Sequence, residues 1–255
     1  RFARPIARAR PLVSRMKAAF GAPGLQVAVA VDGKVVWSRV CGFADRAKRT
    51  PVDATTLFRI GSVSKVFTAS ALARLVQAGE VDLDAEVQEY VPSFPRKGTP
   101  ITIAQLASHQ SGIRHYRGAE HLSTVHYDSV LDSLRVFADD ALLFRPGRTY
   151  FYSSYGFNLL GAVLEGASDA EYGDVLREQL LSPLGLSRTR TDLAGLSGRT
   201  AFYEVREDGS ARRAPRVDLS NRYPSGGLIS TAEEIARLGS ELGDPGFLDR
   251  ATQAT

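Results

Sequence analysis

Several common kinds of protein site are missing from this sequence. Cys41 is the only cysteine among 255 residues, so the chain can form no internal disulfide and no zinc site with two or four cysteine ligands. No run approaches 18 consecutive apolar residues, which predicts that no helix spans a membrane. The motifs G-x-S-x-G, H-E-x-x-H, G-x-G-x-x-G and the Walker loop are also absent. The sequence therefore predicts no nucleophile elbow, no metalloprotease helix and no loop that binds nucleotide phosphates.

The composition that remains is typical of a globular protein. Hydrophobic residues make up 44% of the chain and charged residues 24%, and the length is enough to bury a core in one large domain or two adjoining lobes. The formal net charge is +4, and the basic residues crowd the first segment at Arg1, Arg4, Arg8, Arg10, Arg15 and Lys17. We interpret this segment as a solvated helix face, with an anionic partner or the remnant of a targeting segment as alternatives. Because no recognition motif accompanies these charges, no nucleic-acid partner is expected.

The predicted elements place strands at both ends of the chain and helices between them. The runs Leu25–Val31 and Lys34–Val40 flank Asp32-Gly33, a pattern typical of a β-hairpin. Residues 200–206 and 211–219 are expected to be short strands. Apolar spacing and capping residues predict seven helices, the first of them broken near Pro11, at residues 2–20, 64–78, 102–108, 127–138, 155–167, 171–181 and 231–242.

This segregation of strands and helices indicates an α+β fold rather than a doubly wound sheet. We expect an antiparallel sheet flanked by helices, together with a helical lobe. The predicted sheet lobe is discontinuous and comprises residues 1–60 and 200–255, and residues 61–199 form the predicted helical lobe.

The four histidines invite a metal-site interpretation, because His109, His115, His121 and His126 lie within eighteen residues. Their spacings of six, six and five do not match the close pairs that zinc ligands usually form, and no pair of carboxylates lies nearby on a helix. We therefore interpret them as polar loop residues and expect no metal, with a metal site as the alternative.

The tetrad Ser62-Val63-Ser64-Lys65 opens the most apolar predicted helix. If a helix begins at or just before Ser62, the Ser62 and Lys65 side chains lie on one face and can touch. A serine hydroxyl is a weak nucleophile until a base takes its proton, and a lysine acts as that base only when its pKa falls toward neutrality. Burial must cause most of that fall, since a helix N-terminus contributes only about 0.3–1 kcal/mol. The apolar neighbours expected to bury Lys65 are Ile60, Val63, Val66 and Phe67.

The S-x-x-K pattern alone is not specific, because Ser14 and Lys17 match it as well, on the Arg-rich first segment. From the residues alone, an incidental match at Ser62 therefore stays open. A second group is needed to relay the proton to a leaving group, and Tyr152 in Tyr152-Ser153-Ser154 is the candidate. It follows the Pro146-Gly147 turn and directly precedes an apolar helix. The alternative for Tyr152 is a buried aromatic residue whose hydroxyl is satisfied.

Five motifs in order resemble the serine β-lactamase-related family, which includes class C β-lactamases, penicillin-binding D-Ala-D-Ala peptidases and family VIII esterases. They are Leu57-Phe58-Arg59-Ile60-Gly61-Ser62-Val63-Ser64-Lys65, then Leu106-Ala107-Ser108-His109-Gln110-Ser111-Gly112-Ile113-Arg114-His115-Tyr116, Pro146-Gly147, Tyr152-Ser153-Ser154-Tyr155-Gly156 and Ser225-Gly226-Gly227-Leu228. The resemblance covers about residues 20–240. The stretch Ser111–Tyr116 is most similar to the mitochondrial serine β-lactamase-like peptidase and its bacterial relatives.

This resemblance implies a β-lactamase/transpeptidase-like fold and a set of site residues. It implies that Ser62 is the acylated nucleophile, Lys65 its base partner and Tyr152 the acid–base relay, while Ser154, Gly226 and Gly227 contact the substrate. No metal or organic cofactor is required. Most members have asparagine where this chain has Ser154, so efficient penicillin hydrolysis is in doubt and a small peptide or ester is the expected substrate. By analogy with the family, the compartment is periplasmic or extracellular.

The sequence departs from the family after Tyr152, where it contains no lysine and no histidine and therefore no Lys/His-x-Gly motif. The family's closing C-terminal strands are also missing, which would leave the 25–40 hairpin with an unpaired edge. We expect the chain to be a fragment or those strands to be supplied elsewhere. The predicted function is a serine hydrolase that forms an acyl-enzyme on amide or ester bonds. The alternative is a catalytically weak or inactive scaffold that self-assembles, with a homo-oligomer as its partner.

Overall fold

The computed structural model describes residues 2–253 and divides them into two compact units. The first comprises residues 2–58, 195–216 and 229–247, and the second comprises residues 59–194, 217–228 and 248–253. Strands β4 (Phe58–Arg59) and β8 (Leu228–Ser230) carry the chain from one unit to the other. The predicted sheet lobe included residues 217–228, whereas the structure groups these residues with the second unit. The division into two domains stays a prediction.

The first unit is built on the predicted hairpin, which the structure confirms. Strands β1 (Gly24–Val31) and β2 (Lys34–Asp45) pair antiparallel down to Val31 opposite Lys34, and β3 (Thr50–Pro51) pairs with β2. Both turn residues have positive φ, 51° at Asp32 and 71° at Gly33, as a type I′ turn requires. Among the described residues β1 pairs with β2 alone.

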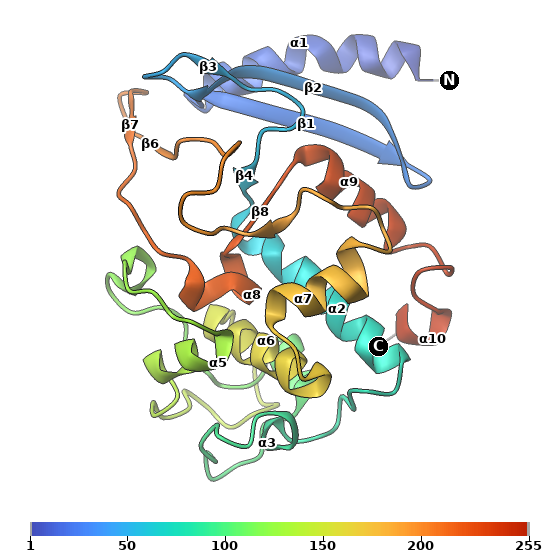
Figure 1. The fold of residues 1–255 in the computed structure, drawn as a ribbon, viewed down its shortest axis with the longest axis vertical. Helices are drawn as coiled ribbons and strands as arrows, with labels where there is room; N and C mark the ends of the chain where they lie inside the picture. Colours follow the sequence, from blue (N-terminus) through green and yellow to red (C-terminus); the bar gives the residue numbers. More distant parts are fainter. Residues whose placement is uncertain (1, 254–255) are drawn as a thin grey trace. The chain divides into compact units, whose positions relative to one another are not determined.

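Two helices pack against this hairpin, α1 (Ala3–Ala19) and α9 (Ala232–Glu241) (Figure 1). The prediction that the first helix breaks at Pro11 is wrong, because α1 continues through it. Proline lacks the N–H that would bond the Ala7 carbonyl, but both residues are exposed, so water can bind that carbonyl instead. Strands β6 (Tyr203–Val205) and β7 (Ala211–Arg213) form a separate pair and are shorter than predicted.

The second unit packs around two helices, α2 (Ser64–Gln77) and α6 (Ser154–Ser168), and both confirm predicted helices. The first eleven residues of α6 are all buried, as expected of a helix that other elements surround. Large side chains from both helices are fully buried in this core, among them Phe67, Leu75, Leu159, Leu160 and Leu164.

Shorter elements complete the second unit: α3 (Val87–Tyr90), α4 (Ile103–Ala107), α5 (Val130–Ser133), α7 (Tyr172–Leu176), α8 (Tyr223–Gly226), α10 (Arg250–Gln253) and β5 (Arg190–Thr191). The predicted helix at 102–108 is confirmed, with Thr102 and Gln105 forming a capping box. The predicted helices at 127–138 and 171–181 are only partly helical. In the first, α5 begins after the cap at Ser129, and in the second, α7 passes into a π turn at Arg177–Leu181.

Helix α8 is held tightly between α2 and α6, and this places the residues that follow it. The Thr68 hydroxyl on α2 donates to the Pro224 carbonyl at 2.6 Å. On the α6 side, a Cβ added at Gly161 would lie 2.1 Å from Pro224 Cγ, so only glycine permits this approach. Ser64 Oγ accepts the Leu228 N–H at 3.1 Å just beyond α8. The backbone at Ser225 is therefore fixed beside the start of α2.

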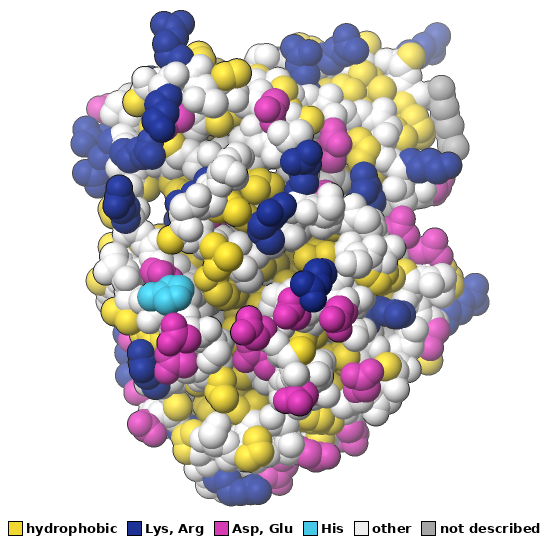
Figure 2. Space-filling view, in the orientation of Figure 1, with side chains coloured by type: hydrophobic (Ala, Val, Ile, Leu, Met, Phe, Trp, Pro, Cys, Tyr) yellow, Lys and Arg dark blue, Asp and Glu magenta, His cyan; other side chains and the backbone are white. Residues whose placement is uncertain are grey.

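Charge on the surface of the second unit is mixed. Figure 2 shows acidic side chains over its helices with basic side chains scattered among them. On the first unit, Arg4, Arg8 and Arg15 of α1 are exposed. None of the helices within residues 2–253 has both the length and the apolar character needed to cross a membrane.

Candidate active site

Ser62 lies in a 3₁₀ turn, Gly61–Val63, that continues directly into α2. The strand before it is anchored by an ion pair between Arg59 Nε and Asp192 Oδ2 at 2.6 Å, in which the Asp192 side chain is fully buried. The Ile60 N–H also donates to the Leu228 carbonyl at 3.2 Å. Gly61 has a φ of +51°, a conformation that glycine adopts without strain. These contacts fix the backbone at Ser62 while its side chain stays exposed and open to a substrate.

Tyr152 reaches Ser62 from ninety positions further along the chain. Its phenol donates a hydrogen bond to Ser62 Oγ at 2.8 Å. The Tyr152 residue directly precedes α6, whose cap is the Ser153 hydroxyl accepting the Gly156 N–H at 2.9 Å. The position of the phenol is therefore set by the start of a buried helix. Such rigid support is needed to hold a hydrogen bond between residues that are distant in the sequence.

Lys65 lies beneath this pair and is buried, with 7% of the residue exposed. Its Nζ donates to the Ser225 carbonyl at 2.6 Å and to Ser154 Oγ at 3.1 Å, and it lies 4.7 Å from the centre of the Tyr152 ring. The described contacts include no hydrogen bond between the Ser62 and Lys65 side chains, so contact between these two side chains stays a prediction. Tyr152 lies against both residues.

The predicted source of Lys65 burial is partly wrong. Phe67 is fully buried, but Val63 and Val66 are 38% and 42% exposed. On a helix, residues one or two positions apart do not face each other, so neither these valines nor Phe67 faces the Lys65 amine. The amine is enclosed instead by the rings of Tyr152 and Phe157 and by the two oxygens it bonds.

The pKa values of Lys65 and Tyr152 are both lowered from their ordinary values. Burial is the largest influence on the amine and lowers the pKa of Lys65 below its ordinary 10.5, with Tyr152 acting in the opposite direction. Burial raises the pKa of Tyr152, but hydrogen bonds to Lys65 and Ser62 and the positive charge of Lys65 outweigh it, so the net shift is downward. Each group thus influences the pKa of the other beside Ser62 Oγ.

Two of the four histidines lie against Tyr152. His109 Nδ1 accepts the Ser153 N–H at 3.2 Å, and His115 Nδ1 accepts the Ser154 N–H at 3.1 Å. The other two lie apart from the site, where His121 Nδ1 contacts the Gly118 carbonyl and His126 Nδ1 contacts Asp218. Within residues 2–253 no three His, Cys, Asp or Glu side chains are arranged to hold a metal ion.

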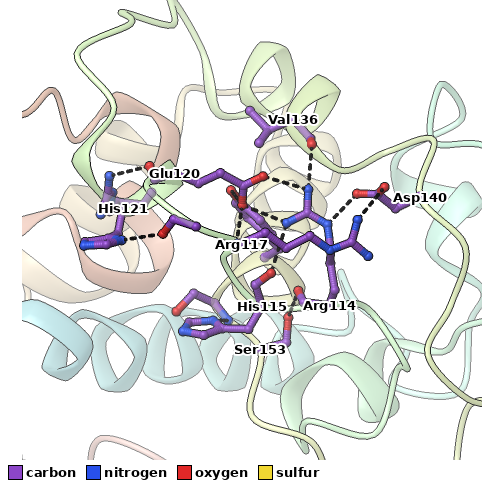
Figure 3. Close-up of polar contacts among 12 residues, drawn as sticks. Arg114, His115, Arg117, Glu120, His121, Val136, Asp140 and Ser153 are labelled. Atoms are coloured by element: carbon purple, nitrogen blue, oxygen red, sulfur yellow. Dashed lines mark hydrogen bonds and ion pairs between the residues drawn. The ribbon is translucent and has the colours of Figure 1, made fainter.

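A buried charge cluster holds the loop that carries His115 (Figure 3). Arg114 bonds both oxygens of Glu120, at 2.8 and 3.0 Å, and Arg114 Nε bonds Asp140. Tyr155 of α6 donates to Glu120 Oε2 at 2.9 Å, and the Ser153 hydroxyl donates to the Arg114 carbonyl at 2.7 Å. The cluster therefore ties this loop to the first turn of α6, next to Tyr152.

The other three predicted contact residues also lie near Ser62 and Lys65. Ser154 contacts Lys65, as described above. A Cβ added at Gly226 would lie 3.8 Å from the Gly61 carbonyl carbon, so Gly226 adjoins the turn that carries Ser62. Gly227 has a packing requirement, because a Cβ there would lie 2.9 Å from the Leu219 carbonyl oxygen and Tyr223 Cα. Contact of these residues with a substrate stays a prediction.

The sequence analysis missed the Ser225 carbonyl and the two histidine acceptors. Ser225 lies in the last of the five motifs, but every residue has a backbone carbonyl, so the residue type does not show which carbonyl accepts a hydrogen bond from Lys65. His109 and His115 lie in the second motif, and the sequence shows that they are close together. It does not show that their rings accept hydrogen bonds from the backbone beside Tyr152, because that depends on how each ring is oriented in the fold.

Comparisons with known proteins show the family of this chain. The family model described as Beta-lactamase matches residues 10–255. Serine beta-lactamase-like protein LACTB, mitochondrial, of Homo sapiens is 31% identical over 313 residues, covering 94% of this chain and 57% of the relative. Penicillin-binding protein 4 of Amycolatopsis lactamdurans is 32% identical, covering 91% of this chain and 62% of the relative. The chain thus spans a little more than half the length of these relatives.

Solved structures match nearly the whole chain. The octameric penicillin-binding protein homologue from Pyrococcus abyssi gives a TM-score of 0.83 at 23% identity, covering 98% of this chain and 59% of that one. EstCE1, described as a hydrolase with promiscuous acyltransferase activity, gives 0.82 at 25% identity, covering 97% and 75%. These matches confirm the predicted fold class.

Proposed function

Because the chain belongs to the Beta-lactamase family, we propose that it is a serine hydrolase in which Ser62 forms an acyl-enzyme with an ester or amide substrate. The observation that carries the proposal is the 2.8 Å hydrogen bond between Tyr152 and Ser62 Oγ, with the buried amine of Lys65 4.7 Å from the centre of the Tyr152 ring. A nucleophile within hydrogen-bond reach of a group that can take its proton is the arrangement that covalent catalysis requires.

The proposed reaction uses these three residues in two steps. Ser62 Oγ attacks the substrate carbonyl carbon while its proton passes to the Lys65–Tyr152 pair. The pair then returns a proton to the departing alcohol or amine, leaving an ester on Ser62. Water attacks that ester through the same pair, which releases a carboxylic acid and restores the Ser62 hydroxyl. The Ser62 N–H, in the first turn of a helical segment, would stabilise the negative charge on the carbonyl oxygen.

For the substrate class, we propose a small peptide or an ester. Ser154 stands where most members of the family have asparagine, and its hydroxyl already accepts a hydrogen bond from Lys65. A serine side chain is shorter than asparagine and has no amide donor, so it holds a substrate amide less well. Efficient hydrolysis of penicillins is therefore not expected.

Labelling of the full chain tests the proposal. A fluorophosphonate probe should add to Ser62, which peptide mapping by mass spectrometry would identify, and Ser62→Ala should remove the adduct. Ser14→Ala alters the other S-x-x-K tetrad, on α1, and should label like the original chain. Absence of any adduct in folded protein, or an adduct that persists in Ser62→Ala, would overturn the proposal.

A catalytically weak scaffold that self-assembles is the second candidate. The structural neighbour from Pyrococcus abyssi is described as octameric, and among the described residues β1 has a free edge, which favours association. Light scattering after size-exclusion chromatography would measure the assembly. If the scaffold is the function, Ser62→Ala assembles normally and the original chain shows neither labelling nor turnover. A monomer that labels at Ser62 contradicts this second candidate.

A further inference from the structure

The backbone on both sides of Tyr152 is bound by two histidines. The His109 carbonyl accepts the Phe151 N–H at 2.8 Å, and the His109 ring Nδ1 accepts the Ser153 N–H at 3.2 Å. His115 Nδ1 accepts the next N–H, that of Ser154, at 3.1 Å. We propose that His109 and His115 are positioning residues, which hold the Tyr152 turn so that the phenol stays in contact with Ser62. This inference rests on the proposed function, because its consequence is the rate of Ser62 acylation.

The rings of both histidines also limit where the phenol ring can move. The His109 ring centre lies 4.7 Å from that of Tyr152 and 4.9 Å from that of Phe157. His115 meets the Tyr152 ring edge-on at 5.6 Å between centres. Tyr152 is therefore bounded by an imidazole on each of two sides, although 37% of the residue is exposed. The two imidazoles therefore restrict rotation of the Tyr152 side chain, which would be free to turn if only solvent surrounded it.

Both hydrogen bonds require a defined proton position. A backbone N–H can only donate, so each Nδ1 must be unprotonated and each ring carries its proton on Nε2. A doubly protonated ring would lose this acceptor and would place a positive charge near the Lys65 amine. The titratable groups facing the two rings are Lys65 of α2, Tyr150 and Tyr152 of the turn, and Tyr116 beside His115.

The environment of the rings favours this neutral state. Burial is the larger influence on each ring, and the positive charge of Lys65 adds to it. Together with its neighbour His115 these lower the pKa of His109 to about 4. The pKa of His115 is lowered by burial and by Lys65. At neutral pH both rings can therefore accept their hydrogen bonds without competition from a proton.

The histidines are themselves placed by firm structure. His109 follows α4 and has a φ of +59°, a left-handed conformation that non-glycine residues adopt only where the surroundings enforce it. His115 follows Arg114, whose guanidinium is fixed by Glu120 and Asp140 (Figure 3). The position of Tyr152 thus depends on two independent anchors, one on each histidine.

Paired substitutions at each histidine separate positioning from bulk packing. Asparagine keeps an acceptor, because its Oδ1 is bonded to Cγ as Nδ1 is in histidine, whereas phenylalanine keeps the ring and removes the acceptor. We expect His109→Phe and His115→Phe to slow Ser62 acylation at saturating probe by about 10- to 100-fold, since small misplacements of a catalytic group have effects of that size. His109→Asn and His115→Asn should stay within about threefold of the original chain, and the probe concentration for half-maximal rate should not change in any of the four.

A second measurement on the unsubstituted protein does not depend on activity. Two-dimensional ¹⁵N–¹H spectra of the imidazoles report which ring nitrogen carries the proton and at what pH each ring titrates. We expect both His109 and His115 to carry the proton on Nε2, His109 to remain neutral at pH 6, and His115 to titrate below its ordinary pKa. His121 and His126 lie apart from Tyr152 and serve as internal comparisons for the tautomer.

The outcomes distinguish this inference from the proposed function. If the original chain shows no acylation, the proposed function fails, and the ¹⁵N spectra still decide whether the histidines hold the turn as the structure shows. If the original chain acylates and both phenylalanine variants acylate equally fast, the positioning role is overturned. Protonation at Nδ1, or titration of both rings near their ordinary pKa, also overturns the positioning role. This measurement uses the unsubstituted protein, so it decides the question even if the phenylalanine variants do not fold.

Discussion

Lys65 and Ser225 lie 160 positions apart in the sequence and are joined by a 2.6 Å hydrogen bond from the amine to the backbone carbonyl. This contact holds the buried amine 4.7 Å from the centre of the Tyr152 ring. In the proposed reaction the lysine therefore acts on the hydroxyl through the phenol, since the charge of each group influences the pKa of the other. The rate of acylation should accordingly depend on the phenol oxygen, on the acceptors around the amine and on the helix that carries Ser225.

The first prediction concerns the phenol oxygen. Tyr152→Phe removes the atom that bonds Ser62 but keeps the ring that covers Lys65. Proton transfer by a positioned side chain accelerates reactions by about 10²–10⁴-fold, so we expect the labelling rate of Ser62 to fall by at least about 100-fold. The midpoint of thermal unfolding should change little, because this side chain is partly exposed. Tyr150→Phe, at the neighbouring exposed tyrosine, is the control and should label at the original rate. Equal labelling of both variants would contradict the prediction.

The second prediction concerns the pH at which acylation begins. Acylation needs the Lys65–Tyr152 pair with a free proton site, so the labelling rate should rise with pH through the lowered pKa of Lys65. Ser154 Oγ accepts a hydrogen bond from the charged amine and thus favours the protonated form. In Ser154→Ala the charged form loses that partner, and the rise should occur at lower pH. The cost in the free energy of unfolding should be about 1 kcal/mol.

A matched serine on α2 provides the control for this pH measurement. Ser70 is also buried, but its hydroxyl donates to the Val66 carbonyl and contacts none of the site residues. Ser70→Ala should leave the midpoint of the pH–rate curve where it is. A midpoint that moves to higher pH in Ser154→Ala would show that the hydroxyl favours the neutral amine instead.

The third prediction concerns the helix that carries the Ser225 carbonyl. Gly161→Ala would force α8 away from α6, because the new methyl group would overlap Pro224. Overpacking of this kind costs about 1–3 kcal/mol, and the shift of α8 should also slow labelling of Ser62. Gly173→Ala is the control, at an exposed position in α7 with open space around it, and should stabilise the protein by about 0.5–1 kcal/mol with no change in labelling. Denaturant unfolding measures both effects.

Much of the fold was predictable because its local signals agree with its packing. Asp32-Gly33 can adopt the two positive φ values of a tight hairpin, and the apolar faces of α2 and α6 match their burial. The break at Pro11 was not correct, because the effect of a proline depends on whether the freed carbonyl is exposed. The sequence alone does not show whether that carbonyl is exposed to water.

The predicted site residues were easier to find than their contacts. Spacing along one helix and resemblance to a family pointed to Ser62, Lys65 and Tyr152. The surroundings of Lys65 were predicted from its sequence neighbours, whereas the structure encloses it with Ser154, Ser225 and Phe157. These contacts arise from chain segments that meet only in the folded protein, and one of them is a backbone atom. Residue type and spacing therefore predict candidate site residues better than they predict the groups that surround them.

The fourth prediction concerns the buried Arg114 cluster and acid stability. Arg114 is almost fully buried and pairs with Glu120 and Asp140, whose side chains are 29% and 31% exposed. Removing one partner of a fully buried ion pair costs about 3–5 kcal/mol, and the cost is smaller here because water and Arg117 still reach the two carboxylates. We expect Arg114→Met to lower the free energy of unfolding at pH 7 by about 2 kcal/mol. Arg177→Met removes exposed ion pairs on the surface of the same unit and should change it by less than about 0.5 kcal/mol.

The pH dependence of this loss identifies its cause. Burial raises the pKa of Glu120, but hydrogen bonds and the charge of Arg114 outweigh it, so the net pKa lies below the ordinary 4.5. A carboxyl group whose pKa is lowered by folding stabilises the protein above that ordinary value, and the stabilisation is lost as pH falls through the folded pKa. The difference in stability between the original chain and Arg114→Met should therefore be largest at neutral pH and should shrink below about pH 4.5. A difference that stays constant down to pH 3 would show that lost packing, rather than charge, accounts for the effect.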